Sequence, residues 1–136
     1  MKHNISISCS KQNLAKIRQF VQQTLDMYQV PDVESHKLVL AVDEVCANLI
    51  IHANNCNPGE KLELIINIDP DENIVFEIKD QGIGFDISKY KEPQIEDIVM
   101  SKRKGGLGLM LVKRIMDQVE FTHEKNHNIC RLIKKL

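Results

Sequence analysis

Long hydrophobic runs and an excess of charge of one sign are both missing from this sequence. No run approaches the about 18 uninterrupted apolar residues of a membrane-spanning helix, and the start, Met1-Lys2-His3-Asn4, lacks the apolar core of a signal peptide. The 18 basic and 19 acidic residues nearly cancel to a net charge of -1, which excludes a sequence-wide attraction to nucleic acid or to a membrane. We therefore expect a cytoplasmic protein.

Paired cysteines are missing as well. The sequence contains Cys9, Cys46, Cys56 and Cys130, and none of them belongs to a C-x-x-C pair. This spacing excludes a disulfide scaffold and favours reduced structural thiols. Histidines lie near Cys56 and Cys130, but structural zinc sites usually use tighter cysteine spacing, so we do not expect such a site.

The remaining composition is typical of a globular domain. The chain has 136 residues, of which 43% are hydrophobic and 27% are charged. This length suits one domain with a buried core and leaves little room for a second core of similar size. We therefore expect residues 1–136 to form a single domain.

Hydrophobic periodicity predicts strands and helices within that domain. Alternation with a period of two indicates strands, and spacings of three and four residues indicate helices. Ser10 and Asp32 are placed to cap the first two helices, and the first must end before Pro31. The predicted strands are 5–9, 62–68, 74–78, 119–123 and 129–133, and the predicted helices are 14–25, 32–53 and 106–117. The strands 62–68 and 74–78 are expected to pair as a hairpin, and one sheet covered by helices on one face is the expected architecture.

Asp80 departs from the pattern of its strand. It continues the phase of Ile74, Phe76 and Ile78, so its carboxylate is predicted to face the apolar side of the sheet, where burial is costly without a partner. An aspartate that only caps the following turn is the alternative interpretation. In Asp80-Gln81-Gly82-Ile83-Gly84, however, two glycines follow the acid and let the backbone approach a flat ligand. An adenine ring, whose amino group would donate to the carboxylate, fits this arrangement.

A second glycine motif, Gly105-Gly106-Leu107-Gly108-Leu109, opens an apolar helix. Backbone N–H groups and the helix dipole favour phosphate at such a position, although glycines also permit close helix packing. Lys102, Arg103 and Lys104 come directly before the motif. They are placed to meet phosphate oxygens, although a short basic run is also typical of a solvated surface.

A polar stripe crosses the second predicted helix. Glu44, Asn48 and His52 are spaced by four residues and therefore lie on one side of that helix. A solvated helix face would explain the three residues equally well. Glu44 and Asn48 also suit a base and a magnesium ligand, because a carboxylate can orient a nucleophile and an amide oxygen binds a hard cation. We expect His52 to be structural.

In this order and spacing, the three segments resemble the nucleotide-binding motifs of the Bergerat-type (GHKL, HATPase) ATPase superfamily, which includes gyrase, MutL and histidine kinases. The resemblance is strongest to RsbW-like anti-sigma factor serine-protein kinases, whose helix motif is very similar to residues 41–53 here. The other two motifs are residues 80–86 and 105–109. This resemblance implies an α+β fold, a two-layer sandwich in which a mixed, largely antiparallel sheet is covered on one face by helices.

The resemblance also implies a role for each motif residue. Glu44 would polarise the attacking hydroxyl group, Asn48 would hold Mg²⁺, and Asp80 would receive the adenine amino group of ATP. Gly82 and Gly84 would shape the adenine pocket. The phosphates would be bound by Gly105, Gly106, Leu107 and Gly108, and by Lys102, Arg103 or Lys104 from a mobile lid formed by residues 85–104.

One segment departs from the family pattern. Relatives commonly have a Gly-Thr-Thr-type segment before the last strand, and its threonine supports the adenine site. The corresponding residues here are His127-Asn128-Ile129. Asn128 is the obvious substitute for the threonine.

The resemblance implies an ATP-dependent serine/threonine protein kinase and anti-sigma factor-like regulator. Its partners would be a STAS-type anti-anti-sigma protein, which it phosphorylates, and a sigma factor or other regulator, which it sequesters. A homodimer is expected, without direct contact to nucleic acid or membrane. The non-catalytic alternative is an ATP-gated protein-binding module, and a structural adaptor would require three coincidental motifs.

Other members of the superfamily fit less well. A histidine kinase needs a separate phosphoacceptor hairpin, but His36 shares its predicted helix with Glu44. Gyrase and MutL relatives couple ATP to large additional domains, for which the sequence up to Leu136 has no room.

Overall fold

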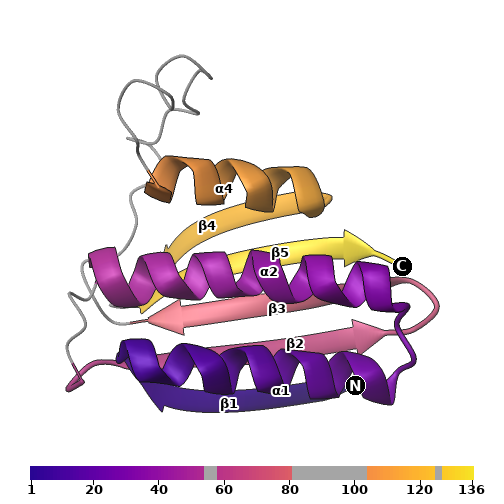
Figure 1. Ribbon diagram of the computed structural model, residues 1–136, viewed down its shortest axis with the longest axis horizontal. Helices are drawn as coiled ribbons and strands as arrows, with labels where there is room; N and C mark the ends of the chain where they lie inside the picture. Colours follow the sequence, from indigo (N-terminus) through magenta and orange to yellow (C-terminus); the bar gives the residue numbers. More distant parts are fainter. Residues whose placement is uncertain (54–57, 81–103, 125–126) are drawn as a thin grey trace.

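The computed structural model describes residues 1–53, 58–80, 104–124 and 127–136. They form a five-stranded sheet in the order β1-β2-β3-β5-β4, with helices over one of its faces (Figure 1). Each neighbouring pair of strands is antiparallel. The α+β two-layer arrangement is therefore confirmed, and within the described ranges the sheet contains no parallel pair.

The bounds of the elements follow the predicted order. The strands are β1 (Lys2–Ser8), β2 (Lys61–Asp69), β3 (Asn73–Asp80), β4 (Gln118–Glu124) and β5 (His127–Lys135). The helices are α1 (Leu14–Met27), α2 (Asp32–Asn48) and α4 (Lys104–Ile115). A short 3-10 turn, η1 (Lys11–Asn13), precedes α1, and a π-helical segment, η2 (Leu49–Ala53), continues α2.

The hydrophobic core lies between the sheet and the helices. The alternating apolar residues of β2 and β3 point into this layer, because both strands are half-buried and every second side chain faces the helices. β2 and β3 form the predicted hairpin, in which Ile68 pairs with Ile74. Fully buried side chains in this layer include Ile17, Leu25, Leu38, Leu62, Leu64, Ile66, Phe76, Ile78 and Leu132.

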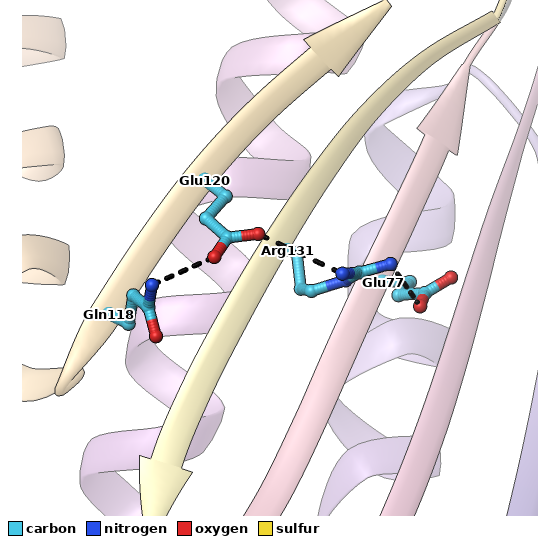
Figure 2. Close-up of polar contacts among 4 residues, drawn as sticks. All are labelled: Glu77, Gln118, Glu120 and Arg131. Atoms are coloured by element: carbon cyan, nitrogen blue, oxygen red, sulfur yellow. Dashed lines mark hydrogen bonds and ion pairs between the residues drawn. The ribbon is translucent and has the colours of Figure 1, made fainter. Parts of the chain in front are cut away.

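The other face of the sheet carries charged side chains together with apolar ones such as Ile65, which is buried. Arg131 on β5 lies between Glu77 on β3 and Glu120 on β4, and its guanidinium group is 3.1 Å and 3.8 Å from their carboxylates (Figure 2). Gln118 donates a hydrogen bond of 2.8 Å to Glu120. Glu77, Arg131 and Glu120 are opposed in register across three strands, so they form a row of paired charges on this face.

The predicted helix caps are wrong in detail. The side chain of Ser10 makes no capping hydrogen bond; the chain instead enters α1 through η1, where the Asn13 N–H donates to the Ser10 carbonyl oxygen at 2.9 Å. The Asn13 amide also donates to the Ser8 carbonyl oxygen. Asp32 is the first residue of α2 and follows the cap residue Pro31, so its charge acts on the helix dipole and does not cap the helix.

Helix α4 begins at Lys104 and ends at Ile115, two residues earlier at each end than predicted. The motif glycines therefore take helical backbone angles, which glycine can adopt although it favours them less than alanine. Within the described part of the chain, no helix is long and apolar enough to cross a membrane.

Candidate functional site

Three of the sequence motifs meet at one end of the molecule. The end of α2, the end of β3 and the start of α4 all lie there (Figure 1). Asn48 is the last residue of α2, Asp80 is the last residue of β3, and Gly105 to Gly108 lie in the first turns of α4. The fold therefore brings together motifs that are far apart in the sequence.

Asp80 faces the helices, as its phase predicts. Only 1% of the residue is exposed. It lines a small pocket whose other lining residues are mostly apolar: Leu49, Ile78, Phe121, Thr122, Asn128, Ile129 and Cys130. A buried carboxylate next to apolar side chains is a strong hydrogen-bond acceptor.

Burial makes the thiol groups of Cys46 and Cys130 unreactive. Among the described residues, Cys9, Cys46 and Cys130 are buried and form no disulfide. Burial, with the nearby charge of Asp80, raises the pKa of the Cys130 thiol to about 12. Burial also raises the pKa of Cys46 well above its usual range, with a smaller effect from Asp43. Because only the thiolate is a good nucleophile, the raised pKa values make Cys46 and Cys130 structural thiols.

Glu44 and Asn48 lie one turn apart on α2, and both are half-buried. Burial raises the pKa of Glu44 above its ordinary value, and the negative charge of Asp43 adds to this increase. Asp43 itself forms an ion pair with Arg18 on α1, and 3.0 Å separates the guanidinium nitrogen from the carboxylate oxygen. A carboxylate with a raised pKa is a better proton acceptor, which suits the base predicted at position 44.

The α-helical backbone predicted up to residue 53 ends earlier in the structure. After Asn48 the chain changes from α-helical to π-helical backbone at Leu49–Ala53. The four-residue spacing of an α-helix therefore ends at Asn48, and the place of His52 on the polar stripe stays a prediction. Such π segments frequently occur at functional sites, but the periodicity of this sequence carries no signal for one.

Several predicted site residues lie outside the described residues. These are Gly82 and Gly84 of the first glycine motif and Lys102 and Arg103 of the basic run. Most of the predicted lid, residues 85–103, also lies there. Lys104, Gly105, Gly106, Leu107 and Gly108 are placed as the first residues of α4. Their assignment to phosphate stays a prediction, as do the roles of Glu44, Asn48 and Asp80.

The structure adds a contact that the sequence did not reveal. The His123 ring nitrogen Nδ1 and the Asn128 oxygen Oδ1 are 2.8 Å apart. The two residues are opposed in the β4–β5 pair, and Asn128 is also opposed to Asp80 in the β3–β5 pair. The sequence predicted strands in this part of the chain, but only the register between β4 and β5 shows that His123 and Asn128 are opposed. Among the described residues, no group of three or more histidine, cysteine, aspartate or glutamate side chains could hold a metal ion.

Solved structures share this fold at low sequence identity. The RsbU and RsbW domains of a Mycobacterium tuberculosis protein superpose with a TM-score of 0.67 and 13% identity, covering 100% of this chain and 32% of that one. The SiaB–SiaC complex from Pseudomonas aeruginosa gives a TM-score of 0.65 and 12% identity, covering 98% of this chain and 89% of the matched chain. At these identities the likeness concerns the fold alone.

Curated relatives are similar over part of their length. The chain is 33% identical over 91 residues to the serine-protein kinase RsbW of Oceanobacillus iheyensis, which is 64% of this chain and 57% of the relative. It is 30% identical over 105 residues to RsbW of Halalkalibacterium halodurans, covering 71% of this chain and 59% of the relative. The matched part thus spans less than two thirds of these relatives.

The family model covers much more of the chain. The model of the histidine kinase-like ATPase domain matches residues 7–134, from the end of β1 to the end of β5. The matched region includes all three motifs and all the elements that position them. The chain therefore belongs to the histidine kinase-like ATPase domain family.

Proposed function

We propose that the protein is an ATP-dependent serine/threonine protein kinase and anti-sigma factor-like regulator of the RsbW type. It would act in the cytoplasm as a single domain over residues 1–136 and as a homodimer. Family membership supports ATP binding, and the RsbW relatives, named as serine-protein kinases, support the reaction. A non-catalytic, ATP-gated binding module is the alternative.

The observation that carries the proposal is the place of Asp80. Its carboxylate is buried in a mostly apolar pocket at the end of β3, and the end of α2, the helix that contains Glu44 and Asn48, lies at the same end of the molecule (Figure 1). This carboxylate suits the adenine base of ATP, because the amino group of adenine can donate a hydrogen bond to it. In this proposal Gly82 and Gly84 shape the adenine pocket.

The half-buried side chains of α2 fit the reacting end of the nucleotide. The amide oxygen of Asn48 suits Mg²⁺, a hard cation that prefers oxygen ligands and supplies charge neutralisation at the phosphates. Glu44, whose pKa is raised, accepts the proton of the substrate hydroxyl group. The start of α4, including Gly105, Gly106, Leu107 and Gly108, offers backbone N–H groups to the phosphates, and Lys102, Arg103 and Lys104 add positive charge.

The proposed partners are proteins. The substrate is a STAS-type anti-anti-sigma protein, and a sigma factor or other regulator is held when that protein is phosphorylated. The RsbW relatives support this class of partner, and the SiaB–SiaC complex is a protein complex formed by a chain of the same fold. No direct contact with nucleic acid or membrane is proposed.

Phosphotransfer is tested with ATP labelled at its terminal phosphate. The protein, with Mg²⁺, is incubated in a lysate of the source organism, and we expect one small labelled protein. Glu44→Ala should lower labelling at least about 100-fold, because it removes the base, while ATP binding is retained. Glu34→Ala, on an exposed part of the same helix, is the matched control and should label normally. Full labelling by Glu44→Ala would refute the role of Glu44; absence of label with intact ATP binding would favour the gated module.

Adenine recognition is tested separately by calorimetry. Asp80→Asn should weaken ADP binding by about tenfold to 100-fold, because a hydrogen bond to a charged acceptor is lost. Asp71→Asn, in the exposed β2–β3 turn, is the control and should bind normally. Unchanged affinity of Asp80→Asn would count against nucleotide binding at this site.

A further inference from the structure

A second pocket opens at the end of the molecule opposite to the candidate site. It has a volume of about 400 Å³, which lies within the about 300–1,000 Å³ typical of small-molecule sites. Its walls are the connection between α1 and α2, the start of α2, and the ends of β2 and β5 (Figure 1). The candidate site lies at the other end of α2, about 25 Å away along its 17 residues. The apolar lining residues of the second pocket are Tyr28, Val30, Pro31, Ile68, Pro70 and Leu136.

The wall formed by the α1–α2 connection is fixed by hydrogen bonds. The Val30 N–H donates to the Leu25 carbonyl oxygen at 3.2 Å, and the Val30 carbonyl oxygen accepts from the buried Ser35 hydroxyl group at 3.2 Å. The Tyr28 hydroxyl oxygen lies 2.8 Å from Nε2 of His3 on β1. Because the backbone and the tyrosine ring are both fixed, this wall is formed without a ligand, which lowers the cost of binding one.

Lys134 is a charged residue at a core position of β5. It continues the phase of the buried residues Cys130 and Leu132, so its side chain projects from the helix-covered face of the sheet. The residue is half-buried and lines the pocket. Among the residues that the structure describes, its ammonium group has no ion-pair or hydrogen-bond partner. A half-buried cation beside apolar side chains favours an anionic partner, because burial removes part of its hydration.

The other charged side chains of the pocket leave positive charge in excess. Lys135 also lines the pocket, and within the described ranges its ammonium group forms no ion pair. Glu34 is the acidic side chain among the described lining residues, and its carboxylate lies 3.9 Å from the ammonium group of Lys37. The pocket therefore combines an apolar wall with two lysine side chains that lack a carboxylate partner.

We propose that this pocket binds a small amphiphilic carboxylate, with its apolar chain against Val30 and Ile68 and its carboxylate paired with Lys134. The apolar chain removes the lining from water, and the carboxylate supplies the anionic partner of the ammonium group. The pocket contains none of the nucleotide motifs, so this inference does not depend on the proposed function.

Decanoate is the probe for this site. Calorimetric titration should show saturable binding of one decanoate per chain, and the amide chemical shifts of Val30 and Ile68 should change. Decanol has the same chain without the charge, and butyrate has the carboxylate with a short chain. Each should bind at least about tenfold more weakly than decanoate, because each lacks one of the two contacts. Absence of saturable decanoate binding, or equal binding of decanol or butyrate, would overturn the inference.

Lys134→Met tests the contact with the carboxylate. Methionine keeps an unbranched side chain but has no charge, so decanoate binding should weaken about tenfold while decanol binding does not weaken. Lys61→Met, at an exposed position at the other end of β2, is the matched control and should bind decanoate normally. Unchanged decanoate affinity of Lys134→Met would contradict the proposed contact. Thermal unfolding checks that the variant folds, and if it does not, Lys134→Gln carries the same expectation.

Titration in the presence of saturating ADP and Mg²⁺ separates this pocket from the candidate site. Because the two sites lie at opposite ends of α2, decanoate should still bind. Competition between ADP and decanoate would place the probe in the nucleotide site and overturn the inference. A protein that binds decanoate as expected but binds no adenine nucleotide would refute only the proposed function.

Discussion

Glu44 and Asp80 are both carboxylates of the candidate site, but their surroundings differ. Asp80 ends a strand and is almost fully buried, whereas Glu44 is half-buried on α2 beside the charged Asp43. Burial and the charge of Asp43 raise the pKa of Glu44. The folded protein therefore binds the Glu44 proton more tightly than the unfolded chain does, and ionised Glu44 opposes folding.

Replacement of Glu44 by glutamine should therefore stabilise the protein in a pH-dependent way. Above the raised pKa the wild type pays an unfavourable energy for the ionised group, and this term disappears as the pH falls below the ordinary value of 4.5. Urea unfolding should show that Glu44→Gln raises the free energy of unfolding at pH 7 more than at pH 4. Glu34→Gln, at an exposed position, is the control. The same gain at both pH values would contradict the raised pKa.

At the scale of residues, the sequence was enough to predict features that depend on neighbouring positions in the chain. The phase of β3 was enough to place Asp80 on the buried face, because side chains alternate along a strand. The contact of His123 with Asn128 could not be predicted in the same way. It depends on the register between β4 and β5, which periodicity does not fix.

At the scale of elements, the end of α1 shows a local strain. Gln29 has a φ of 57°, in the left-handed region that glycine prefers. It occupies the position after the helix cap, where the Val30 N–H donates to the Leu25 carbonyl oxygen at 3.2 Å and the Gln29 N–H donates to that of Asp26 at 3.1 Å. These two bonds close the helix in a Schellman motif, which requires the left-handed residue whatever its side chain.

Gln29→Gly should stabilise this helix end. A left-handed conformation costs a residue with a Cβ atom about 1–2 kcal/mol, and glycine avoids that cost but loses more entropy on folding. We expect a net increase of about 0.5–1 kcal/mol in the free energy of unfolding, measured in urea. Gln22→Gly is the control for the effect of glycine inside the helix. It lies in the middle of α1 and should destabilise the protein by about 1 kcal/mol. A loss of stability in Gln29→Gly would contradict this account of the helix end.

The elements also show where sequence-based prediction stops. Long periodic segments such as α2 and the β2–β3 hairpin were predicted correctly, because one continuous apolar face determines them. Their ends were less well predicted: Ser10 and Asp32 do not cap the helices, and the last turns before Ala53 are π-helical. Helix ends depend on local hydrogen bonds and tertiary packing, which compete with propensity.

For the whole molecule, the two faces of the sheet contribute differently. The helix-covered face buries a continuous apolar layer, whereas the other face carries the ion pairs around Arg131 (Figure 2). The two-layer class was predictable from alternating strands and helices. The strand order β1-β2-β3-β5-β4 was not, because β5 lies between β3 and β4 and no local pattern specifies that insertion.

Stability should therefore depend strongly on the apolar layer under the helices and only weakly on the ion pairs of the other face. Phe76 is fully buried in the middle of β3, so Phe76→Ala removes a large apolar contact and leaves a cavity. We expect it to lower the free energy of unfolding by about 3–5 kcal/mol in urea. Arg131 is 45% exposed at its side chain, and its ion pairs are screened by water, so Arg131→Ala should cost less than about 1 kcal/mol. If Arg131→Ala costs as much as Phe76→Ala, the other face is a structural network in its own right, and the single apolar layer does not account for the stability of the fold.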